Sequence, residues 1–152
     1  MDLKEDGLKE ALWSVAIPGF GQILNEKYFK GFILITLELL INIQSNMNIA
    51  IIASFRGNTC AAVQQTNYQW LMFYPSIYLF GIWDAYNDAI NSRSPCSFLP
   101  FTMAAYLGTI GIIYSKDIKI MGVLLGPIWL PLEFMFIGGL LGLIICNFFK
   151  IY

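Results

Sequence analysis

Two carboxylates lie inside long apolar stretches of this sequence. Glu38 is the only charged residue in 31–55, and Glu133 is the only one in 120–149. Charged side chains are costly within lipid, and those that occur there commonly mark a proton, ion or substrate route. Asn42 lies one turn after Glu38 on the same helical face, so Glu38 and Asn42 could line such a route. A role in packing between helices is equally open, because neither apolar stretch contains a basic partner.

A second pair of carboxylates, Asp84 and Asp88, is spaced four residues apart and therefore shares one helical face. A DxxxD pair can hold Mg²⁺ together with a phosphorylated substrate. Around this pair, however, "DAYNDAINSRS" contains a single arginine, Arg93, and no second acidic pair. The pattern favours two aspartates that lie in water just beyond the end of an apolar segment.

Other catalytic and metal-binding signals are missing from the sequence. It contains no histidine, which removes the commonest metal ligand and the commonest general base. Cys60, Cys96 and Cys146 form no CxxC pair, and there is no GxSxG motif. We therefore predict no catalytic residue, metal or cofactor, and a protein that is not an enzyme. A net charge of −1 without a basic cluster argues against nucleic acid as a partner.

The composition indicates the kind of environment in which these residues lie. The chain is 57% hydrophobic and only 12% charged, against roughly 25% charged in ordinary soluble domains. We expect an all-α, polytopic membrane helical bundle of four to five apolar segments. The predicted organisation is a cytoplasmic tail, 1–10, followed by a single membrane-embedded domain, 11–152. The N-terminus lacks the basic leader of a secretory signal, so we expect the chain to be retained whole.

The apolar segments have recognisable ends. The first long one covers 31–55, or ends near Ile43 and leaves "QSNMN" as a turn. An exposed loop is expected over 57–69, a turn over 91–95, and further spans over 70–86, with Pro75 inside, and 97–115. The stretch 120–149 is too long for one upright span, so it forms either a kinked, tilted helix or two segments that meet near Pro131. Gly122 with Gly126, and Gly138 with Gly142, are small-xxx-small pairs that permit close helix contact.

The segment 11–24 is too short to cross a bilayer and contains Pro18, Gly19 and Gly21. We expect a short helix that breaks at Pro18–Gly21, returns to its own side, and is covered by the polar face that carries Glu38 and Asn42. Six basic residues then lie on the side of both termini and three on the other, which places the termini in the cytoplasm. The two sets are Lys4, Lys9, Lys27, Lys30, Arg93 and Lys150 against Arg56, Lys116 and Lys119.

The residues around this break form a motif: Pro18-Gly19-Phe20-Gly21-Gln22, then Tyr28, then Lys30-Gly31 at the start of a long apolar segment. With the later Trp83-Asp84, the motif resembles that of two-transmembrane ("TM-two") domain proteins over about residues 11–90. The resemblance implies a small bacterial integral membrane protein and transfers no catalytic residue. Physically the motif predicts a helix-breaking turn, although glycine N–H groups could alternatively cradle a phosphate.

These observations predict a multi-pass protein of the bacterial cytoplasmic membrane without catalytic activity of its own. Its expected partners are the lipid bilayer and either another membrane protein or a second copy of itself. The alternative is a small transporter or ion-conducting subunit that uses Glu38 and Asn42. A third possibility is a lipid-phosphate enzyme that uses Asp84 and Asp88.

Overall fold

The computed structural model describes residues 3–90 and 96–151, and these residues are mainly helical. The predicted turn at 91–95 lies outside the described residues. Nine helices and one short β-hairpin follow each other in the described part of the chain. They are α1 (Leu3–Ala16), α2 (Phe20–Leu24), α3 (Tyr28–Ser45), α4 (Met47–Phe55), α5 (Thr59–Gln65), α6 (Tyr68–Leu71), α7 (Tyr74–Ile90), α8 (Leu99–Tyr114), β1 (Lys119–Ile120), β2 (Val123–Leu124) and α9 (Gly126–Ile151). The all-α prediction is confirmed.

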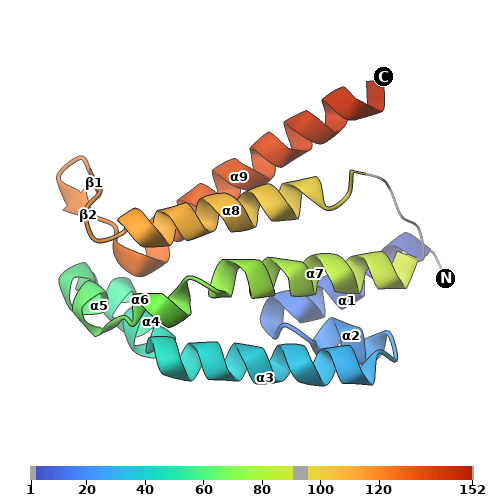
Figure 1. Cartoon of the computed structure of the whole chain (residues 1–152), viewed down its shortest axis with the longest axis horizontal. Helices are drawn as coiled ribbons and strands as arrows, with labels where there is room; N and C mark the ends of the chain where they lie inside the picture. Colours follow the sequence, from blue (N-terminus) through green and yellow to red (C-terminus); the bar gives the residue numbers. More distant parts are fainter. Residues whose placement is uncertain (1–2, 91–95, 152) are drawn as a thin grey trace.

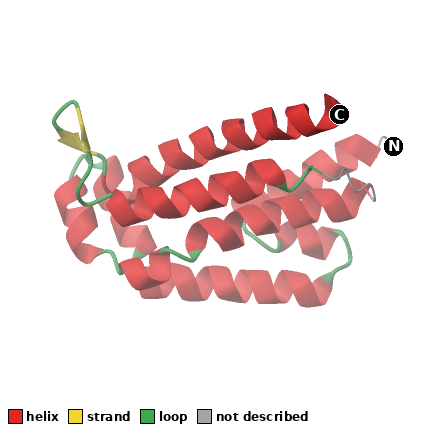
Figure 2. Ribbon diagram, turned by 45° about the horizontal axis from the view of Figure 1, so that its top comes forward, coloured by secondary structure: helices red, strands yellow, loops and turns green. Residues whose placement is uncertain are grey.

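Helix α7 is the central element of the bundle. It lies between α3 on one side and the antiparallel α8–α9 pair on the other, and α1 packs along it (Figure 1). The chain begins and ends at the same end of the molecule, while α5 and the β-hairpin lie at the opposite end (Figures 1 and 2). Met47, Leu71 and Ile112 form a small buried apolar cluster near that opposite end. This cluster joins α4, α6 and α8, and further buried apolar side chains come from α3, α5, α7 and α9.

The predicted break in the first segment is confirmed. Helix α1 ends at Ala16, the chain turns at Pro18 and Gly19, and the five-residue α2 follows. The expected start of this helix is wrong, because α1 begins at Leu3 rather than near residue 11. Residues 3–10, which we expected in a tail, belong to α1. Gly7 and Glu10 are buried, and Gly7 lies against Tyr86 and Ile90 of α7.

A second break separates α3 from α4. Asn46 adopts a left-handed conformation with φ 58°, and the axes of the two helices differ by 64°. Asparagine tolerates this conformation better than most residues, and its side-chain amide donates to the Gln65 carbonyl at 3.0 Å. Neither possibility for 31–55 matches as stated, because within "QSNMN" only Asn46 breaks the helix: α3 runs to Ser45 and α4 begins at Met47.

The predicted exposed loop at 57–69 is wrong, because most of it forms α5. Asn58 caps this helix by accepting a hydrogen bond from the Ala61 N–H at 3.1 Å. Ala62 is fully buried, so the segment packs against the bundle. The expectation for Pro75 was also wrong. It lies in the first turn of α7, where a missing N–H costs no intrahelical hydrogen bond.

The C-terminal part differs from the prediction at its start. Met121 and Gly122 have positive φ values and connect β1 to β2, so 120–125 is not helical. Helix α9 then continues unbroken from Gly126 through Pro131, which matches the single-helix alternative. The small-residue pair predicted at Gly122 and Gly126 is therefore wrong. Gly138 and Gly142 do lie directly on the α8 backbone, at Met103–Ala104 and Leu99–Pro100.

The expected number of membrane spans is only partly matched. Within the described residues, Gly126–Phe149 is long and apolar enough to cross a membrane, with a mean hydropathy of 2.1. Of the most apolar 18-residue stretch of this helix, 22% is buried within the described part of the molecule. The bent pair α3–α4 passes the same test if it counts as one span, and α8 is apolar but shorter.

Candidate functional site

A buried polar network fastens the helix break at Pro18–Gly19 to α7. Its centre is Gln22, whose side chain is fully buried. The Gln22 amide donates to the Gly81 carbonyl at 2.8 Å and to Asp84 Oδ2 at 3.1 Å. The Ser14 hydroxyl accepts from the Gly21 N–H at 3.1 Å and lies 3.4 Å from Gln22 Oε1. Side chains from α1, α2 and α7 therefore satisfy each other's hydrogen bonds in the interior.

The network ends in an ion-pair triad. Lys30 Nζ, from the first turn of α3, lies 2.9 Å from Asp84 Oδ1 and 3.0 Å from Asp88 Oδ2. Asp84 is only 7% exposed, and both of its carboxylate oxygens are hydrogen-bonded, one to Lys30 and one to Gln22. A buried carboxylate needs such partners to remain charged. The triad thus joins α3 to the helix that already holds α2.

Two glycines make this arrangement sterically possible. Gly19 has φ 103°, and a Cβ there would lie 2.5 Å from the Gly31 carbonyl oxygen. A Cβ on Gly21 would overlap the Glu10 carbonyl and the Ser14 hydroxyl. Gly31 in turn lies against Gly19 and Ile23, so the backbones of the break and of α3 touch directly. The predicted helix-breaking turn is the observed structure.

The cover over this break differs from the one predicted. Gly31 and Ile35 of α3, together with Gly81 of α7, lie against Pro18 and Gly19. Glu38 and Asn42 come one and two turns farther along α3. The expectation was wrong because the chain packs its backbones together at glycines instead of presenting polar side chains to the break.

Most of the motif residues meet at this site, but Phe20, Tyr28 and Trp83 lie outside it. Asp84 is hydrogen-bonded by Gln22 and Lys30. Gly19 lies against Gly31, Pro18 against Gly81, and Gly21 against Ser14. Tyr28 is exposed at the start of α3. Trp83 points to another side of α7, where its indole N–H donates to the Ser97 hydroxyl at 3.3 Å. Tyr28 and Trp83 therefore take no part in the polar network.

The expectation that both aspartates lie in water is wrong for Asp84. Periodicity within one segment placed Asp84 and Asp88 on one face but could not identify the cation that they share. Ser14 and Asn25 were missed altogether. Asn25 donates to the Ala85 carbonyl at 2.8 Å. A signal for Ser14 was available, because Glu10 and Ser14 are spaced four apart and form a polar face on α1, and both are buried.

The three candidate intramembrane polar residues are not brought together. Glu38 is half-buried; its carboxyl group faces the Tyr74 hydroxyl, and Oε2 is buried with no hydrogen-bond partner among the described residues. The Asn42 amide lies 3.4 Å from Asn48 Oδ1 instead. Glu133 is exposed on the outer face of α9, among Trp129, Phe136 and other apolar side chains. In the described residues Glu38 and Asn42 therefore do not form a joint polar path.

The chemistry open to the site follows from these contacts. Lys30 already occupies the space between Asp84 and Asp88, so a Mg²⁺ ion would have to displace an ammonium group held by two carboxylates. Within the described parts of the chain, no group of three or more acidic or cysteine side chains is arranged to hold a metal ion. The polar network thus has a structural role: its hydrogen bonds and ion pairs hold α1, α2 and α3 against α7.

Comparison with known proteins identifies no relative. No family model, no curated protein and no solved structure matches this chain. The resemblance to two-transmembrane domain proteins stays a prediction based on the motif residues, and the function has to be argued from the geometry.

Proposed function

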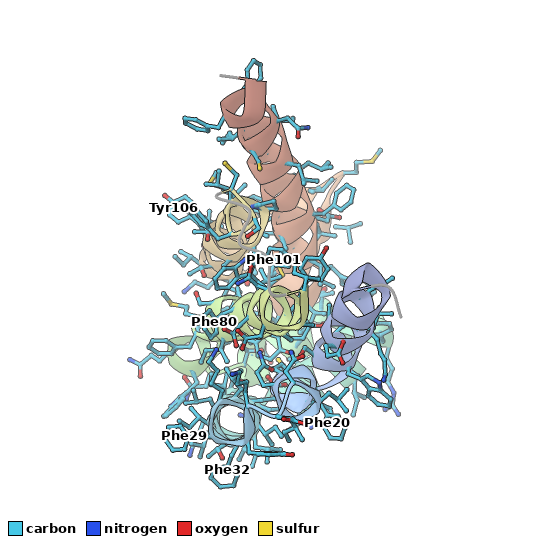
Figure 3. All side chains as sticks on the ribbon, turned by 90° about the vertical axis from the view of Figure 1, so that its right-hand side faces the viewer. Phe20, Phe29, Phe32, Phe80, Phe101 and Tyr106 are labelled. Atoms are coloured by element: carbon cyan, nitrogen blue, oxygen red, sulfur yellow. The ribbon has the colours of Figure 1, made fainter. Side chains whose placement is uncertain are left out.

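We propose that this chain is a multi-pass protein of the bacterial cytoplasmic membrane that acts by binding other membrane components and carries out no reaction of its own. The supporting observation is the distribution of polar and apolar side chains. Ser14, Gln22, Ser45 and Ser115 are fully buried, whereas large apolar side chains cover the outside. Phe29, Phe32 and Tyr106 point away from the bundle (Figure 3).

This distribution is unfavourable in water. Each large apolar side chain left in water forgoes roughly 1.5–3 kcal/mol of transfer free energy. Exposed side chains of this kind occur on every long helix, among them Leu12 on α1, Ile43 on α3, Phe80 on α7, Ile113 on α8 and Phe136 on α9. A surface of this extent needs an apolar surrounding. The same arrangement, with polar groups facing the bundle interior, is the one expected in lipid.

Binding rather than catalysis is favoured by what the groups of the polar network do. Gln22, Lys30 and Asp84 each make at least two polar contacts with other parts of the chain. Those groups stabilise the fold, and the surface left for interaction with partners is mostly apolar. We expect lipids, another membrane protein or a second copy to contact that surface.

Membrane extraction and copurification test this function. After alkaline carbonate washing, the protein should remain in the membrane fraction and float with reconstituted vesicles. Mild-detergent purification followed by mass spectrometry should then recover specific lipids or a membrane protein. Release of the protein by carbonate, in a folded and monodisperse form, would contradict the proposal.

A second candidate function, ion transport, is favoured by Glu38 Oε2, which lacks a hydrogen-bond partner within the described part of the chain. If Glu38 carries protons or cations, Glu38→Gln should abolish flux in reconstituted vesicles without unfolding the protein. If Glu38 only packs against Tyr74, the amide keeps its shape and most hydrogen bonds, and stability should change by about 1 kcal/mol. Wild-type vesicles without proton, sodium or potassium flux would exclude this second function.

A further inference from the structure

A lateral groove opens between α4, α7 and α9, with a volume of about 250 Å³. Its floor is the buried apolar cluster of Met47, Leu71 and Ile112. Its rim includes Phe55 of α4 and Leu132 of α9, which are both exposed. The groove therefore leads from the outer surface to a cluster of buried apolar side chains.

The groove walls offer almost no hydrogen-bonding group. Tyr74 and Tyr78 contribute their stacked rings, whose centroids are 5.3 Å apart. Their hydroxyl groups are used elsewhere: Tyr78 donates to the Val15 carbonyl at 2.9 Å, and Tyr74 faces the Glu38 carboxyl. Met47, Ile51, Met135 and the remaining lining side chains are apolar. An occupant must accordingly be apolar along the groove.

The size of the groove indicates what kind of apolar occupant it takes. The groove has a volume of about 250 Å³ and opens to the surface between α4, α7 and α9, so it admits a slender apolar group from the side. A linear hydrocarbon chain is narrow enough, and each buried CH₂ group contributes favourably.

A basic residue lies immediately beside this rim. Arg56 follows Phe55 at the end of α4 and is exposed, and no ion pair involving it is found among the described residues. An arginine at this place complements a phosphate group, to which guanidinium binds through paired N–H donors.

On the basis of the proposed membrane residence, we propose that the groove binds one acyl chain of a phospholipid whose phosphate lies at Arg56. The occupant is a bilayer lipid held at a defined place, in contrast to the exchanging lipids around the rest of the surface. In this site Ile51 of α4 lines one side of the acyl chain, and Leu132 of α9 lines the rim above it.

Electron paramagnetic resonance of a lipid probe tests this site. The full-length protein is placed in phosphatidylcholine nanodiscs that contain phosphatidylglycerol spin-labelled on its acyl chain. We expect a motionally restricted component. Ile51→Trp should fill the groove and reduce that component by the share of the groove lipid, while Ile52→Trp, on the exposed neighbouring face, should retain it in full. Arg56→Gln should weaken binding several-fold by removing the phosphate contact.

The outcomes separate this inference from the proposed function. A protein that floats with vesicles but shows no restricted lipid, or equal losses with Ile51→Trp and Ile52→Trp, overturns the site and leaves membrane residence intact. A protein that does not float contradicts the membrane function itself. If circular dichroism shows that Ile51→Trp is unfolded, Leu132→Trp fills the same groove from its exposed rim and is judged by the same two results.

Discussion

At the scale of single residues, the buried amide of Gln22 is the group on which the helix break depends. Gln22→Met keeps the size of the side chain but leaves the Gly81 carbonyl and Asp84 Oδ2 each with one donor fewer. Because both acceptors are buried, we expect a loss of about 1–3 kcal/mol in the free energy of unfolding. Denaturant titration in detergent micelles measures it.

The exposed glutamine Gln69 supplies the control for this change. Its side chain faces outward from α6, so Gln69→Met should alter stability by less than about 0.5 kcal/mol. Equal effects of Gln22→Met and Gln69→Met would mean that the buried hydrogen bonds contribute nothing to stability.

The ion-pair triad predicts non-additive mutations. Lys30→Gln leaves two carboxylates near each other, one of them buried, without a cation. We expect this change to cost about 1–3 kcal/mol, toward the lower end because Lys30 is 46% exposed and water screens its charge. Asp84→Asn in the Lys30→Gln background should then cost less than it does alone.

A double-mutant cycle measured by thermal unfolding checks this coupling. Lys27→Gln is the matched control, because Lys27 is exposed and has no ion pair among the described residues. Additive losses for Lys30 and Asp84 would show that the pair is a surface contact of negligible energy.

At this scale, the local backbone behaviour of a residue can be predicted from the sequence better than its long-range side-chain contacts. Gly19 and Pro18 could be assigned to a helix break because their backbone properties are local. The pairing of Lys30 with Asp84 spans 54 positions and depends on how α3 packs against α7. No periodicity within either segment contains that information. The same limit explains why Asp84 was expected in water and Ser14 was missed.

At the scale of elements, close backbone packing distinguishes Gly19 from another glycine with positive φ. Gly57 has φ 75°, but a Cβ there would meet nothing within 4 Å. Gly57→Ala should therefore cost only the conformational strain of about 1–2 kcal/mol. Gly19→Ala adds overlap with Gly31 and Ile35, and we expect a total loss of about 2–5 kcal/mol.

Thermal unfolding of the two glycine variants in the same detergent compares these costs. The difference between them reports the contact between the helix break and α3 together with the additional backbone strain at the larger φ of Gly19. Similar midpoints for Gly19→Ala and Gly57→Ala would indicate that α3 can move away from the break at little cost.

The ends of elements were predicted where turn chemistry is strong. The break at Pro18–Gly19 matches the α1–α2 connection, and the apolar segment predicted over 97–115 matches α8 as a helix. The predicted loop at 57–69 was assigned from its small, polar composition, but the Asn58 cap and the buried Ala62 stabilise a helix there. Apolar composition likewise suggested a helix from residue 120, where Gly122 instead forms a hairpin turn.

At the scale of the whole molecule, contacts along α7 trace the path of the first two helices. Near the C-terminal end of α7, Gly7 lies against Ile90. Nearer the start of α7, the Tyr78 hydroxyl donates a hydrogen bond to the Val15 carbonyl. After the break, the chain again contacts positions nearer the C-terminal end of α7: Gln22 donates to Asp84, and Lys30 pairs with Asp88. Helices α1 and α2 thus form a hairpin that starts and ends at one end of α7.

The depth of this hairpin determines its topology in a membrane. From Tyr78 to Ile90, α7 rises by roughly 18 Å, which is little more than half of a hydrocarbon core of about 30 Å. The backbone at Gly19 is covered by Gly31 and Ile35, as lipid-embedded breaks require. We therefore expect a re-entrant hairpin, with α3 starting on the side where α1 began.

Thiol labelling of intact cells tests this topology with three single-cysteine variants. In a background carrying Cys96→Ala and Cys146→Ala, the exposed Cys60 beyond α4 should react with a membrane-impermeant maleimide. Two further variants, made with Cys60→Ala, are Lys9→Cys and Lys27→Cys, which flank the hairpin at exposed positions. Both should be protected until the cells are lysed. Labelling of Lys27→Cys but not of Lys9→Cys in intact cells would instead mean that the segment crosses the bilayer completely. In that case the contacts of Gln22 and Lys30 with α7 could not persist, because Lys27 and the end of α7 would lie on opposite sides of the membrane.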